Sequence, residues 1–121
     1  MRVWFLRLAA IYFVVGVSLG YAMSVTEVFV QAPVHAHINL LGWVSLAIFG
    51  LIYYVRPDAA KTRLAKVHFW LYNIGLPIML AALSVFLGGQ HAAGPVIGLG
   101  ATLVVIGILC FVVNLFREIR D

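Results

Sequence analysis

The chain has 121 residues, of which 64% are hydrophobic and 10% are charged, and its formal net charge is +4. Because roughly a quarter of the residues in a soluble domain are charged, this composition excludes an ordinary water-soluble domain. The positive charges all lie on one side of the predicted membrane, so they indicate topology, and a nucleic acid is not an expected partner.

Apolar runs predict four transmembrane helices, near residues 8–26, 36–55, 67–88 and 94–116. Each run is close to the ~20 residues that cross the hydrocarbon core of a bilayer. Little of the chain remains outside them, so we predict an all-α integral membrane protein with a single four-helix domain over residues 1–121. The first run follows Arg2 and Arg7 as a signal peptide would, but its ~18 residues exceed the ~7–15 of a signal core. We expect it to stay as the first helix.

All eight basic residues fall on one side of the predicted membrane. They precede the first helix, connect the second to the third, or follow the fourth: Arg2, Arg7, Arg56, Lys61, Arg63, Lys66, Arg117 and Arg120. By the positive-inside rule this side is cytoplasmic, so both termini are expected in the cytoplasm. The sequence therefore predicts a multi-pass protein of the inner (cytoplasmic) membrane, in contact with the lipid bilayer.

Several residues suggest how the helices pack. Gly16 and Gly20 in the first helix, and Gly94 and Gly98 in the fourth, have the four-residue spacing that lets helices approach closely, within one chain or between copies. Pro77 should kink the third helix or mark a local backbone adjustment. Aromatic residues near the predicted helix ends are expected at the membrane interface, namely Trp4, Tyr12, Tyr53, Tyr54 and Trp70.

The second predicted helix begins with two histidines, in the segment VHAHINLLGW at residues 34–43. Successive helical residues turn by ~100°, so the rings of His35 and His37 diverge by ~200° at nearly the same depth. Two histidines that chelate one metal on one helix favour a spacing of four residues instead. The observed spacing predicts two separate sites, each completed by another helix or another subunit.

Ionisable residues inside a membrane are candidates for function. Neutral imidazole ligates iron, and a haem fits between helices, so a redox-active haem is the leading functional interpretation of the pair. The alternative is that both rings lie among the headgroups or bond to nearby carbonyls. A zinc or copper ion is not expected, because no other soft ligand is close in the sequence.

The other two histidines are expected to have different roles. His91 lies in the outer loop and is interpreted mainly as a solvated residue. His68 begins the third helix at the opposite side, and roughly 27 Å of helix separates residue 37 from the end of the second helix. His68 therefore does not share a metal with His35 or His37 in one chain, and we expect an interfacial or packing role for it.

Two segments resemble the catalytic subunit (subunit I) of the C-family (cbb-type) haem–copper oxidases. HAHINLLGWVSLAIFGLIYYVRP, residues 35–57, is similar to its tenth helix, and VHFWLYNIG, residues 67–75, is similar to the start of its eleventh. The resemblance covers about residues 34–75, and the four-helix length suits the ninth to twelfth helices of that subunit.

This resemblance implies that His35 and His37 are axial ligands of haem iron, the first matching the ligand of the high-spin haem and the second that of the low-spin haem. The copper-binding histidines, the cross-linked tyrosine and the partner histidine of the low-spin haem belong to earlier helices of the family. A complete oxygen-reducing centre in one chain is therefore not expected, and neither is copper.

The family's twelve helices form three similar four-helix arcs around a pseudo-threefold axis, and this chain has the length of one arc. We predict that three copies form a homotrimeric ring, with haem b between His35 of one copy and His37 of the next. The sequence contains no C-x-x-C-H segment, so the haem is expected to be non-covalent.

A haem with a histidine on each face has no open coordination position, which favours electron transfer with a quinol or a cytochrome as redox partner. Two alternatives stay open: an accessory or assembly subunit without stable haem, and a haem-based enzyme or sensor that reacts with a gas. The sequence does not decide whether the protein is an enzyme.

Overall fold

The structure is a computed structural model that describes residues 2–121, which form helices and short connections without strands. The long elements are α1 (Arg2–Thr26), α5 (Arg63–Leu87) and α6 (Gly94–Glu118), together with a composite second rod. That rod consists of α2 (Ala32–His37), the π-helix η1 (Ile38–Val44) and α3 (Ser45–Val55). Two short helices, α4 (Pro57–Ala60) and η2 (His91–Ala93), lie in the connections. Each of the four rods is long and apolar enough to span a membrane, which confirms the predicted number of spans.

Three of the four rods begin earlier than their apolar runs. The first three begin at Arg2, Ala32 and Arg63, whereas the sequence predicts residues 8, 36 and 67. Hydropathy detects only the part of a helix that suits hydrocarbon, whereas backbone hydrogen bonding continues into the polar interface. At the start of α5, for example, the Thr62 side chain accepts a hydrogen bond from the Ala65 N–H at 3.1 Å, which caps the helix outside the apolar run.

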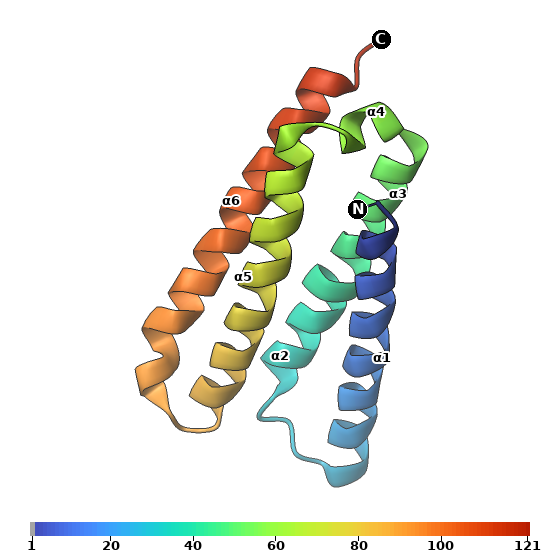
Figure 1. Ribbon diagram of the computed structural model, residues 1–121. Coiled ribbons are helices and arrows are strands. Elements are labelled where there is room, and N and C mark those ends of the chain that lie inside the picture. Colours follow the sequence, from blue (N-terminus) through green and yellow to red (C-terminus); the bar gives the residue numbers. More distant parts are fainter. Residues whose placement is uncertain (1) are drawn as a thin grey trace.

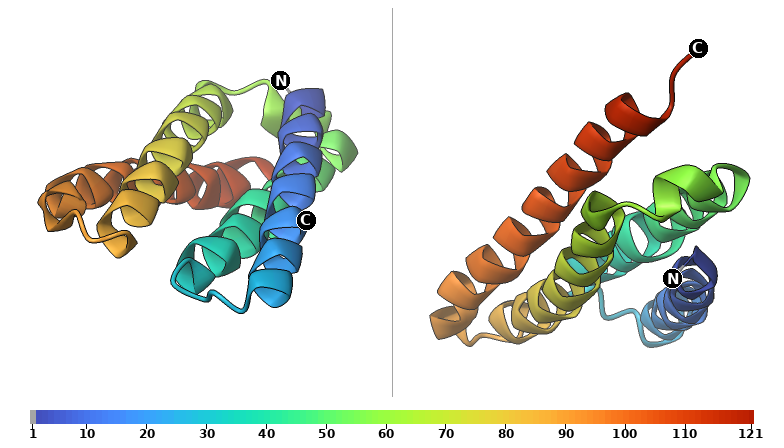
Figure 2. Two further views of the ribbon diagram at one scale, coloured as in Figure 1. Left: turned by 90° about the horizontal axis from the view of Figure 1, so that it is seen from below. Right: turned by 45° about the horizontal axis from the view of Figure 1, so that its top comes forward.

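The rods form two antiparallel hairpins, one from α1 and the composite rod and the other from α5 and α6 (Figures 1 and 2). The N-terminus, the α3–α4 turn and the C-terminus lie at one end of the bundle, and α2 begins at the other end (Figure 1). The basic residues in the first turns of α1, around α4 and at the end of α6 therefore share one end, as the predicted topology requires.

The α5–α6 hairpin has a very close backbone crossing at two glycines. A methyl group added to Gly100 would lie 2.5 Å from the Met79 nitrogen and 2.8 Å from the Gly75 carbonyl oxygen. Gly98, which has the predicted packing spacing, has no atom within 4 Å of such a methyl group, and Gly94 has only an ordinary contact at 3.8 Å. The tightest packing of α6 within the chain therefore occurs at Gly100, and Gly107 also packs on the backbone of α5. The helix α5 continues through Pro77 as one α-helix.

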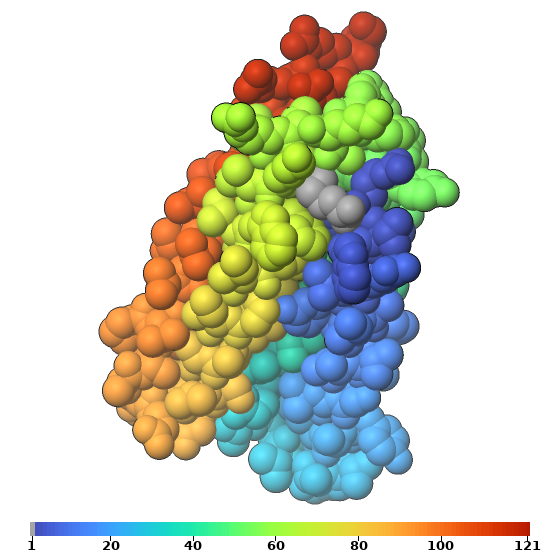
Figure 3. Space-filling model, viewed as in Figure 1, coloured from blue at the N-terminus to red at the C-terminus, as the bar shows by residue number. Residues whose placement is uncertain are grey.

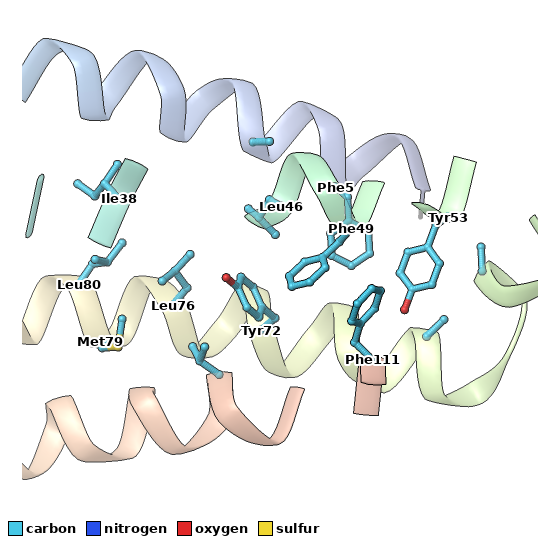
Figure 4. Close-up of a cluster of buried hydrophobic side chains, with 14 of the residues drawn as sticks. Phe5, Ile38, Leu46, Phe49, Tyr53, Tyr72, Leu76, Met79, Leu80 and Phe111 are labelled. Atoms are coloured by element: carbon cyan, nitrogen blue, oxygen red, sulfur yellow. The ribbon is translucent and has the colours of Figure 1, made fainter. Parts of the chain in front are cut away.

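His68 is fully buried in an aromatic cluster near the end that holds the termini. Its ring centroid lies 4.5 Å from that of Phe49, 5.1 Å from that of Phe5 and 5.0 Å from that of Phe111. Figure 4 shows the phenylalanines of this cluster together with Tyr53. The Tyr53 hydroxyl lies 2.9 Å from His68 Nδ1, in hydrogen-bonding distance. Of the two roles expected for His68, the structure shows packing.

The interfacial position predicted for Tyr53 is wrong, because this side chain is fully buried. Its hydroxyl has a buried partner in His68, which removes the need to reach water. The prediction fits Tyr54, Trp4 and Trp70 better, since 61%, 50% and 61% of these side chains are exposed. Sequence position alone does not separate two adjacent tyrosines that face opposite sides of one helix.

The Tyr53–His68 contact makes a testable prediction. Tyr53→Phe should lower the free energy of unfolding by about 1 kcal/mol, because it leaves a buried imidazole without its partner. His68 Nε2 already has no partner among the described residues, so no second bond within this part of the chain compensates. The measurement is the thermal unfolding midpoint in detergent. Tyr54→Phe, at the exposed neighbour, is the matched control, and equal shifts for the two variants would contradict the assignment.

Candidate functional site

The histidine pair lies where the composite rod changes its helical form. His35 and His37 are in the last turn of α2, and η1 follows at once. The Ser45 N–H donates to the Leu40 carbonyl, five residues back, and the Ser45 hydroxyl donates to the same oxygen at 2.8 Å. The Tyr72 hydroxyl of α5 donates to the next carbonyl, that of Leu41, at 2.7 Å. Segments of π-helix are rare and occur frequently at functional sites.

The pattern of apolar residues does not predict this π-helix. Gly42 inside the segment LLGW is its visible signal, because a glycine there allows a close approach. A methyl group at Gly42 would lie 2.5 Å from the Tyr12 ring, so this ring packs directly on the backbone of η1. Tyr12 is accordingly half-buried, and its ring contacts a helix of its own chain as well as the surroundings.

His35 is held against α1. Its Nδ1 lies 2.8 Å from the Gly16 carbonyl oxygen. A carbonyl only accepts, so Nδ1 carries a proton, and in the neutral ring the lone pair is then on Nε2. A methyl group at Gly20 would lie 2.6 Å from His35 Cε1, which shows that the ring packs directly on this glycine. The predicted close packing of Gly16 and Gly20 therefore occurs within the chain, and it makes room for an imidazole.

Asn39 completes the surroundings of His35. Its Nδ2 donates to the His35 carbonyl at 3.1 Å and also lies 3.2 Å from His35 Nδ1 and 3.4 Å from His35 Nε2. A methyl group at Gly16 would lie 2.5 Å from Asn39 Oδ1, so the amide also packs on α1. One side chain thus connects the histidine, its own helix and the neighbouring helix.

His37 takes a different partner. Its Nδ1 lies 2.7 Å from the Pro33 carbonyl oxygen of its own helix, so Nδ1 donates here too and the lone pair is on Nε2. Its side chain is exposed, whereas that of His35 is half-buried. The two rings therefore contact different elements, α1 for His35 and the first turn of α2 for His37. That either ring ligates a metal stays a prediction.

The hydrogen bonds of both rings are those expected of an axial ligand of a haem iron. An imidazole that ligates through Nε2 usually donates Nδ1–H to a carbonyl or a carboxylate, which sets the tautomer and the orientation of the ring. Both histidines show this pattern. The exposed surface near His37 on the same rod is apolar, with 61% of Leu40 exposed, and suits a hydrophobic macrocycle.

The remaining histidines do not join the pair. His91 is exposed in the connection between α5 and α6, where its ring lies 4.8 Å from that of Phe86, and His68 is buried near the opposite end. Within residues 2–121, no group of three or more His, Cys, Asp or Glu side chains is placed to hold a metal ion.

The four long apolar rods define the class as a multi-pass membrane protein, with two histidines in its second rod. The family model described as cytochrome c and quinol oxidase polypeptide I matches residues 30–92, more than half of the chain. The chain belongs to this family. The matched region includes the composite rod with both histidines and all of α5. No curated protein and no solved structure matches the chain.

Proposed function

We propose that the protein binds haem b without a covalent bond and transfers electrons through a haem that has a histidine on each face. The observation that carries the proposal is that His35 and His37 both donate Nδ1–H to a backbone carbonyl. In the neutral ring, this bond leaves the lone pair on Nε2, the atom that would ligate the iron. Bound haem supplies a one-electron redox centre, and redox partners of the expected class are a quinol or a cytochrome.

Four residues around the two histidines orient the rings or make room for them. The Gly16 carbonyl orients His35, and Gly20 leaves the space that the ring occupies. Asn39 ties His35 to its own helix, and Pro33 orients His37 through its carbonyl. These hydrogen bonds fix the orientation of both imidazole rings before any ligand binds, so little side-chain entropy is lost on binding.

Assembly follows from the divergence of the two rings. One chain does not place both imidazoles on one haem, because they face separate elements and diverge by ~200° around the helix. We propose that His35 of one copy and His37 of the next ligate the same haem, in a homotrimer that resembles a complete twelve-helix subunit I. The exposed apolar surfaces of α1 and α6 support contacts with further copies or with lipid.

We also propose which part of subunit I the chain matches and which side of the membrane its termini face. The chain corresponds to the ninth to twelfth helices of a C-family (cbb-type) subunit, and both termini face the cytoplasm of a cell with this protein in its inner membrane. The shared end of the basic residues supports this orientation. The histidine pair then lies towards the outer side.

Absorption spectra of the purified protein test the proposal. After haem-supplemented expression and purification in detergent, we expect reduced and oxidised bands of a six-coordinate, low-spin b-type haem, unchanged by carbon monoxide. Native mass spectrometry should give the mass of three chains with haem. Absence of haem bands would contradict haem binding and favour an accessory or assembly role. Ready binding of carbon monoxide would contradict the two-histidine site and favour a gas-reactive enzyme or sensor.

A further inference from the structure

A groove of about 770 Å³ opens at the end of the bundle opposite the histidine pair, between the start of α1 and the first half of α5. Its apolar walls come from Trp4 and Leu8 on α1 and from Phe69, Trp70 and Ile74 on α5. Figure 3 shows this face, with the start of α1 in dark blue beside α5 in yellow-green. The two tryptophans are half exposed or more, so the groove is open on the side that faces the surroundings.

The same groove has a positive rim. Lys61 and Lys66 line it, both side chains are exposed, and neither forms a salt bridge with a described residue. The Arg7 guanidinium lies 5.1 Å from the centre of the Trp4 ring and adds a third positive charge close by. The described residues that line the groove include no acidic side chain. The apolar groove thus has at least two unpaired positive charges on its rim, at the predicted membrane interface.

The apolar walls and the positive rim together indicate which kind of ligand fits the groove. An apolar cleft suits an acyl chain, whereas lysines beside a transmembrane helix attract the phosphate of a lipid headgroup. No histidine, cysteine or methionine is among the described lining residues, so the groove offers no ligand to a haem iron. We propose that this groove binds an anionic phospholipid, with its phosphate between Lys61 and Lys66 and an acyl chain along Trp4 and Trp70.

A second copy of the chain is a poorer match for the rim. The chain has only four acidic residues. Glu27 lies just after α1, at the opposite end of the bundle. Asp58 already pairs with Arg56 at 3.2 Å, and this hydrogen bond lowers the pKa of the Asp58 carboxyl. Glu118 at the end of α6 and Asp121 after it remain, but the same five-residue segment carries Arg117 and Arg120 and has no net charge. Charge complementarity therefore favours a lipid phosphate.

Tryptophan fluorescence measures the proposed binding, because Trp4 and Trp70 line the groove. The third tryptophan, Trp43, stacks on Phe13 outside it, with ring centroids 4.4 Å apart, and is replaced in a Trp43→Phe background. The protein is placed in nanodiscs of phosphatidylcholine that contain increasing amounts of dibrominated phosphatidylglycerol, whose bromines quench nearby indoles. A parallel series uses dibrominated phosphatidylcholine. Haem is not required, so the result is independent of the proposed function.

We expect the anionic lipid to quench at about tenfold lower mole fraction than the zwitterionic lipid. The double variant Lys61→Gln/Lys66→Gln should lose this preference. The double variant Arg63→Gln/Arg117→Gln removes the same charge at exposed positions outside the groove and should keep it. Equal quenching by both lipids, an unchanged preference in the lysine variant, or no quenching because a second copy fills the groove would each overturn the proposal.

Discussion

Replacement of His37 by alanine is expected to remove the low-spin haem spectrum of the protein. Under the proposed assembly every haem depends on one His37, so the loss affects every site of the oligomer. Removal of groups that only orient a ligand costs 10–100-fold in metal affinity, so loss of the ligand itself should cost more than about 100-fold. The measurement is haem content per chain together with the reduced spectrum, after expression and purification identical to those of the unchanged protein.

His37 is a sharper target than His35 because its side chain is exposed and its hydrogen bond stays within its own helix. The alanine variant should therefore fold, which circular dichroism checks. His91→Ala, an exposed histidine at the same end, is the matched control and should keep full haem content. Added imidazole should restore a six-coordinate spectrum in the His37 variant. A variant that retains the original spectrum would refute the assignment of His37 as a ligand.

Replacement of Gly100 by alanine is expected to destabilise the bundle by about 3 kcal/mol, at the upper end of the usual cost of overpacking. The new methyl group would meet the Met79 nitrogen at 2.5 Å and the Gly75 carbonyl oxygen at 2.8 Å. Both are backbone atoms, so relief requires α5 and α6 to move apart along their contact. Unfolding in detergent, followed by circular dichroism, measures the change in free energy.

Gly98 provides the control in the same helix. A methyl group there has no atom within 4 Å, so Gly98→Ala should leave stability unchanged or raise it by up to about 1 kcal/mol through helix propensity. The two alanine variants should thus have effects of opposite sign or very different size. Similar destabilisation by both would show that the glycines act through helix propensity or through contacts between copies, and not through the α5–α6 crossing.

Much of the architecture was predictable from residue patterns. The number of spans follows from four apolar runs, and the gathering of the basic residues at one end follows from their positions between and beside these runs. The order of the segments HAHINLLGW and VHFWLYNIG pointed to subunit I of the haem–copper oxidases, and the family match confirms that level of relationship. The residues His35 and His37 stand out because imidazole is costly in hydrocarbon and their spacing does not suit one chelate.

Other features required the packed structure. Helix periodicity did not reveal η1, because the π-helix is held by bonds from Ser45 to a carbonyl five residues back and by the Tyr72 hydroxyl of another helix. Spacing did not show that Gly20 accommodates the His35 ring or that Gly98 has no neighbour within the chain. The position of Tyr53 near a predicted helix end suggested the membrane interface, whereas its side chain is buried against His68 of α5.

The sequence by itself thus determined the membrane class, the four spans, the family and the two histidines, because these depend on local hydropathy and on short segments of chain. Only the tertiary structure decided the tautomer of each histidine, the glycines at which helices meet, and the groove beside Lys61 and Lys66. Each of these depends on which atoms of distant segments come within a few ångströms of each other, and one-dimensional periodicity carries no such distances.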